Sequence, residues 1–105
     1  MKPHKIIFQA AAVDDLSDLR RQTFINVGPI AAEAFINRLV AFCNAFDIAP
    51  NRGTLQTDIQ HDLRVVGFER SITVAFRVKD DRVEFLRFFA KGTNWAEEFN
   101  DDDQG

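Results

Sequence analysis

The stretch that decides the fold reads Phe68-Glu69-Arg70-Ser71-Ile72-Thr73-Val74-Ala75-Phe76-Arg77-Val78, then Asp80-Asp81, then Val83-Glu84-Phe85-Leu86-Arg87-Phe88-Phe89. Within 68–78 the even-numbered positions are apolar and most odd-numbered ones are polar, with Arg70 as the exception. A period of two predicts a β-strand with one buried face. Residues 63–67 predict a further strand just before it.

The pair Asp80-Asp81 predicts a two-residue turn between two antiparallel strands. The expected partners across this hairpin are Val78 with Val83, Arg77 with Glu84, and Phe76 with Phe85. The opposite charges of Arg77 and Glu84 favour this register and predict a cross-strand ion pair. Continued along the strand, the register places Arg87 opposite Val74, toward the apolar face. Residues 83–89 are apolar on both faces, which predicts a strand inside the sheet.

Upstream of this region the pattern is helical. Residues 5–8 predict a short strand, and apolar residues then recur at spacings of three and four from Ala10 onward. Asn26-Val27-Gly28-Pro29 ends this first helix, because Gly suits a helix C-terminus and Pro the first turn of the next helix. A second helix is predicted from Pro29 to Phe46. The short connection predicts an antiparallel helix hairpin.

These elements define an α+β fold of order β-α-α-β-β-β, with a helix hairpin packed on a small, mostly antiparallel sheet. Residues 54–62 are polar and predict a surface loop. We expect one domain over residues 4–99 and an acidic, flexible C-terminal tail over residues 100–105.

The 105-residue chain has a net charge of −3, and the charge is unevenly distributed. Residues 52–92 hold eight basic and six acidic side chains, whereas residues 93–105 hold five acidic and no basic ones. A general nucleic-acid binder normally carries an overall basic excess. The pattern instead favours a local arginine cluster that meets an acidic partner.

The single cysteine, Cys43, excludes an intramolecular disulfide and a cysteine-rich zinc site, and its helical phase predicts a structural role. No metal or cofactor is predicted. No run of 18 apolar residues occurs and the N-terminus lacks a signal-peptide pattern, so we expect no membrane association and a cytoplasmic location.

In the order and spacing of its motifs, the chain resembles the RelE/ParE superfamily of bacterial toxins, and ParE-like members in particular. The likeness covers roughly residues 5–99. The residues that carry it are Ala12-Val13-Asp14-Asp15-Leu16, Ala34-Phe35, Pro50-Asn51-Arg52-Gly53, Leu63-Arg64, residues 72–78, residues 83–89 and Asn94-Trp95.

The resemblance implies the toxin of a type II toxin–antitoxin pair, neutralised by direct binding of a cognate antitoxin. ParE-like members inhibit DNA gyrase, whereas RelE-like members are ribosome-dependent mRNA endonucleases. Contact with operator DNA is expected only through the antitoxin. A degenerate member that retains only antitoxin binding is a third interpretation.

Two departures from the family pattern bear on activity. The usual strand tyrosine is Phe76, and the usual late arginine is Thr93; the chain has no tyrosine at all. RNA cleavage needs cations and a proton donor and acceptor at the reacting phosphate. The sequence therefore favours the gyrase inhibitor, and we predict no catalytic residue. We expect neither of the two histidines, His61 and His4, to be catalytic.

Five residues are candidates for contact with the target or the antitoxin: Arg64, Arg70, Arg87, Lys91 and Trp95. Two of them have alternative structural roles, because Arg87 on an apolar face needs an ionic partner and Trp95 is able to pack in the core. We also expect an apolar groove between the helix hairpin and the exposed sheet edge. The acidic residues 97–103 are expected to cover the cations in the free protein.

Overall fold

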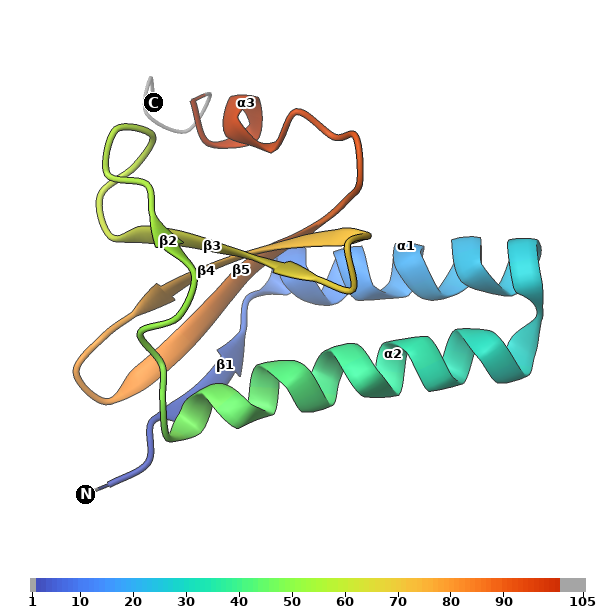
Figure 1. The fold of residues 1–105 in the computed structure, drawn as a ribbon, viewed down its shortest axis with the longest axis horizontal. Helices are drawn as coiled ribbons and strands as arrows, with labels where there is room; N and C mark the ends of the chain where they lie inside the picture. The colour runs from blue at the N-terminus through green and yellow to red at the C-terminus, as the bar shows by residue number, and fades with distance from the viewer. Residues whose placement is uncertain (1, 101–105) are drawn as a thin grey trace.

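The computed structural model describes residues 2–100 and has the predicted α+β fold (Figure 1). The elements in chain order are β1 (Lys5–Phe8), α1 (Ala10–Val27), α2 (Pro29–Asn44), the 3-10 helix η1 (Ala45–Asp47), β2 (Thr54–Leu55), β3 (Leu63–Phe68), β4 (Ile72–Val78), β5 (Arg82–Ala90) and α3 (Trp95–Asn100).

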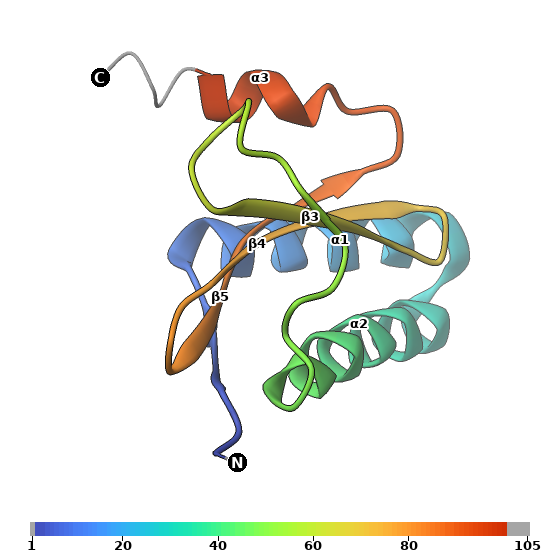
Figure 2. The same cartoon turned by 60° about the vertical axis from the view of Figure 1, so that its left-hand side comes forward.

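The five strands form one sheet in the order β1-β5-β4-β3-β2. β1 runs parallel to β5, and the other three neighbouring pairs are antiparallel. β5 therefore lies inside the sheet, as predicted. The α1–α2 hairpin covers one face of the sheet and α3 lies over the other (Figures 1 and 2).

Aromatic side chains fill the main core between the helix hairpin and the sheet. Phe46 stands edge-on to Phe76 and Phe85, with ring centroids 5.1 and 5.3 Å apart, and all three are fully buried. Such edge-to-face pairs stabilise a core by about 0.5–1.5 kcal/mol beyond their buried area. A second, smaller cluster on the opposite face contains Leu63, Ala75, Phe89 and Phe99.

The turn between the helices follows the predicted chemistry. Gly28 has φ +96°, a backbone conformation that glycine adopts without strain, and its N–H donates to the Phe24 carbonyl at 2.9 Å. Pro29 then begins α2. In Figure 1 the two helices consequently lie side by side and run in opposite directions.

The predicted hairpin register is confirmed from residue 76 onward, because Phe76 pairs with Phe85, Arg77 with Glu84 and Val78 with Val83. Beyond this point the prediction is wrong. A β-bulge shifts the register between Ala75 and Phe76, so Arg87 pairs with Ala75 rather than Val74. A bulge inserts one unpaired residue, here Leu86, which no alternation in the sequence signals.

Residues 68–78 do not form one strand. Phe68 ends β3, and Glu69 and Arg70 have φ of 49° and 57° in the turn that leads to β4. Arg70 broke the alternation for this reason: it belongs to the turn. Two other boundaries also differ from prediction, since α2 ends at Asn44 before η1, and the predicted loop 54–62 begins with the edge strand β2.

Candidate functional site

Arg87 is held in place by a carboxylate from α1. Its Nε and Nη2 donate to the two oxygens of Asp15 at 2.7 and 3.2 Å, and its guanidinium lies 4.8 Å from the ring centre of Phe89. The hydrogen bond that Arg87 donates to Asp15 raises the pKa of Arg87 above its ordinary value. A third contact, with Glu98 of α3, is longer at 3.5 Å. Arg87 therefore has the ionic partner that its position on the sheet required.

A cleft of about 530 Å³ borders Arg87 on the α3 side of the sheet. Arg77 also lines it and donates to Gln60 Oε1 at 2.6 Å. The predicted Arg77–Glu84 ion pair is wrong: the two residues are register partners, but Glu84 accepts from Arg82 Nε at 2.7 Å. Trp95 packs beside Phe99 in the smaller core cluster.

Arg70 and Lys91 lie together at the opposite end of the strands. Both side chains are exposed, and the Lys91 N–H donates to the Ser71 carbonyl at 2.8 Å, which holds the end of β5 against the β3–β4 turn. Next to Arg70, Glu69 accepts from Arg38 Nε and Nη2 at 2.8 and 2.9 Å. This pair ties the β3–β4 turn to α2.

An apolar groove of about 410 Å³ lies beside this turn, between the helix hairpin and the end of the sheet. We call it the hairpin groove; its lining is Leu19, Thr23, Val27, Ala31, Phe35, Arg38, Ser71, Ile72 and Ala90. The predicted apolar groove thus exists, but it opens at the strand ends rather than along a sheet edge.

Large apolar side chains are exposed where α1 meets α2. Phe24, Ile25, Val27 and Ile30 are 54, 73, 64 and 86% exposed. Contiguous exposed apolar residues commonly mark interaction surfaces. These residues are not among those predicted from the sequence, because Ile25 and Ile30 lie in helical phase with the polar faces of the two helices and not with their apolar stripes.

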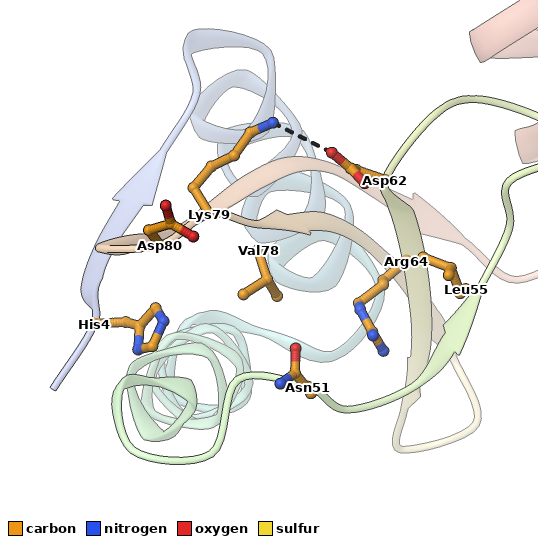
Figure 3. Close-up of a pocket in the computed structure, with 8 residues that line it drawn as sticks. All are labelled: His4, Asn51, Leu55, Asp62, Arg64, Val78, Lys79 and Asp80. Atoms are coloured by element: carbon orange, nitrogen blue, oxygen red, sulfur yellow. Dashed lines mark hydrogen bonds and ion pairs between the residues drawn. The ribbon is translucent and has the colours of Figure 1, made fainter. Parts of the chain in front are cut away.

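Arg64 lies apart from the other candidates. It is on β3, four residues before Phe68 and so about 13 Å along the strand from the turn end. It lines a cleft of about 390 Å³ together with His4, Asn51 and Val78 (Figure 3). The structure therefore brings together Arg70 with Lys91, and Arg87 with Trp95 on the α3 side, and leaves Arg64 alone.

The remaining reactive side chains are in structural or exposed positions. Cys43 is fully buried, and this burial raises the pKa of its thiol to about 12. His61 is 88% exposed and lies 3.2 Å from Asp62. Within residues 2–100, no three His, Cys, Asp or Glu side chains are grouped so as to hold a metal ion, and no helix is long and apolar enough to cross a membrane.

The acidic C-terminal segment is described only in part. Glu98 reaches Arg87, and α3 extends to Asn100. The rest of the predicted tail, residues 101–105, lies outside the described residues.

The fold is shared with chains of solved toxin–antitoxin complexes. A chain of the chromosomal ParDE TA system from P. aeruginosa superposes with a TM-score of 0.73 at 20% identity, covering 83% of this chain and 95% of that one. A chain of the toxin–antitoxin complex RelBE2 from Mycobacterium tuberculosis gives 0.62 at 17% identity, covering 89% and 97%. No curated protein sequence matches significantly.

The class is therefore that of the small α+β toxins of the RelE/ParE superfamily. More closely, the family model for the ParE toxin of the type II toxin–antitoxin system, parDE, matches residues 6–95, and the chain belongs to this family.

Proposed function

We propose that this toxin inhibits DNA gyrase by binding it, without chemistry of its own, and is neutralised by a cognate antitoxin that docks in the hairpin groove. The absence of chemistry is proposed because the arginines beneath α3 are already bound to other side chains. Arg87 is bound to Asp15 and Arg77 to Gln60, so both guanidiniums that line the cleft beneath α3 already have hydrogen-bond partners.

The sheet face beneath α3 is also poorly suited to RNA cleavage. Phe99, 4% exposed, and the indole of Trp95 cover it, and Leu63, Ala75 and Phe89 lie below. Thr93 and the absence of tyrosine remove two groups that the resemblance associates with the nuclease. A surface of this kind favours binding over general acid–base catalysis.

The hairpin groove fits an amphipathic partner segment. Its apolar lining continues to the exposed Val27, and Arg70 and Lys91 lie beside its Ser71–Ala90 wall. A disordered antitoxin segment is able to fold into such a groove as a helix, with apolar side chains inward and acidic ones toward the cations.

The test of the target is a supercoiling assay with purified gyrase and toxin. We expect inhibition at micromolar toxin and its relief by the antitoxin encoded beside the toxin gene. In parallel, messenger RNA in a translating extract should remain uncut. Ribosome-dependent cleavage that Arg64→Ala abolishes would favour the endonuclease, while normal supercoiling and normal growth, with antitoxin binding retained, would indicate a degenerate member.

A further inference from the structure

Arg64 is a half-buried arginine whose guanidinium is largely unused. Its one described hydrogen bond runs from Nη1 to the Arg52 carbonyl at 3.3 Å, whereas a guanidinium carries five N–H donors. Within the described part of the chain, no carboxylate lies within ion-pair distance of Arg64, although Arg38, Arg82 and Arg87 each have at least one. The remaining donors are therefore open to a ligand.

The Arg64 side chain donates to a loop that is itself held by hydrogen bonds. Arg52 donates to the carbonyls of Ala49 and Ala45 at 2.7 and 3.0 Å and stacks 4.6 Å from the Phe46 ring centre, so its own carbonyl is fixed. At Gly53, with φ +71°, a Cβ would lie 2.3 Å from the Val65 carbonyl oxygen, so the loop runs tightly against β3. A ligand for Arg64 would meet a preorganised donor.

The cleft around Arg64 combines this donor with an apolar surface. Figure 3 shows the Arg64 side chain directed toward Asn51, with Val78 between Arg64 and His4. Leu55 of β2, 48% exposed, is the cross-strand partner of Arg64 and also lines the cleft. On the far side Lys79 Nζ is 3.5 Å from Asp62, which offsets that acidic charge, and the exposed Asp80 completes the lining.

These features fit a single carboxylate better than a nucleic-acid backbone. A planar guanidinium binds a carboxylate through two parallel hydrogen bonds. The exposed Asp80 and the net charge of −3 would repel a chain of several phosphates more strongly than one carboxylate. The cleft borders β2, one of the two edge strands of the sheet, against which an extended segment is able to lie.

We propose that the Arg64 cleft binds the carboxylate of a Glu or Asp side chain in an extended segment of the protein partner, whose apolar neighbour contacts Val78 and Leu55. The site is separate from the hairpin groove. The inference rests on the proposed function in one respect only, namely that the ligand belongs to a protein.

The test is a titration of the full-length toxin, followed through the arginine Nε–H signals by NMR. The probe is a capped pentapeptide of alternating Val and Glu, and its matched control carries Gln in place of Glu. We expect the Glu peptide to shift the Arg64 signal and the Gln peptide to leave it unchanged. Arg64→Lys, followed through the backbone N–H signals of Leu55 and Val78, should weaken binding about tenfold by removing the two-point contact. Arg21→Lys, at an exposed position on α1, should leave it unchanged.

Inorganic phosphate is the competing probe. A response to phosphate but not to the Glu peptide would overturn the proposal in favour of a phosphate ligand. Equal responses to the Glu and Gln peptides, or none at millimolar peptide, would also overturn it. The wild-type titration decides the matter even if Arg64→Lys does not fold. Because no gyrase is present, its outcome is independent of the supercoiling assay.

Discussion

Asp15 on α1 and Arg87 on β5, 72 positions apart in the sequence, form an ion pair beside the part of β5 that does not pair with β1. β1 pairs only with residues 82–85 of β5. Just beyond, Asp15 Oδ2 accepts from the Phe88 N–H at 2.9 Å as well as from Arg87 Nε at 2.7 Å. One carboxylate thus replaces the missing strand as an acceptor and neutralises the guanidinium.

The first prediction is that Asp15→Ala lowers the free energy of unfolding by about 2–4 kcal/mol. The Asp15 side chain is only 13% exposed, and its loss leaves the Phe88 N–H without its acceptor and Arg87 with only the longer contact to Glu98. Urea denaturation measures the change.

The control for this variant is Asp14→Ala, at the neighbouring exposed position, with an expected change within about 0.5 kcal/mol. The double variant Asp15→Ala/Arg87→Met should lose less than the two single variants together, because the unpaired charge is gone. Equal losses for Asp14→Ala and Asp15→Ala would contradict the structural role of Asp15.

The second prediction concerns the hairpin groove. Val27→Glu should weaken binding of the cognate antitoxin by at least about tenfold, because it places a charge in an apolar contact, and should leave the unfolding free energy nearly unchanged at this 64% exposed position. Calorimetric titration gives the affinity. Ile48→Glu, 75% exposed and outside the groove, is the matched control; similar effects of both variants would argue against docking there.

The third prediction concerns the cations beside that groove. Arg70→Gln/Lys91→Gln should weaken antitoxin binding at low salt, by about 0.2–1 kcal/mol for each exposed charge pair lost, and much less at high salt. The measurement is the affinity at two salt concentrations. Lys2→Gln removes a charge elsewhere and should have no such salt-dependent effect. A loss independent of salt would mean that the two side chains do not act through their charge.

The fourth prediction is a pH dependence. The hydrogen bond from Arg38 lowers the pKa of Glu69 below its ordinary value. Because the folded-state pKa is the lower one, the contribution of this pair is present above the unfolded-state pKa and is lost as the pH falls through the folded-state pKa.

Glu69→Gln should therefore reduce the fall of Tm as the pH drops from the unfolded-state pKa of Glu69 through its folded-state pKa. It should also lower Tm slightly at neutral pH. Asp58→Asn, at an exposed acidic residue for which the structure describes no ion pair, should keep the wild-type limb. Parallel curves for wild type and Glu69→Gln would show that the pair contributes nothing.

Local patterns in the sequence were sufficient for the main elements. The spacing of three and four from Ala10 to Phe46 and the Gly28-Pro29 break predicted the helix hairpin, and Asp80-Asp81 predicted the register from Phe76 to Val83. These features depend on residues that are close together in the sequence and on their backbone preferences, so they are visible in the sequence itself. The family resemblance followed from the same motifs.

Only the tertiary structure decided which charges meet. The bulge at Leu86 displaced Arg87 from its expected partner, and Asp15, 72 positions away, then became its acceptor. Glu84 accepts from Arg82 and not from its register partner Arg77. Arg64, which donates to the loop held by Arg52, lines an open cleft. Periodicity reports which face of an element is buried; ion pairs and clefts depend on distances between elements, and those are set when the helix hairpin, the sheet and α3 pack together.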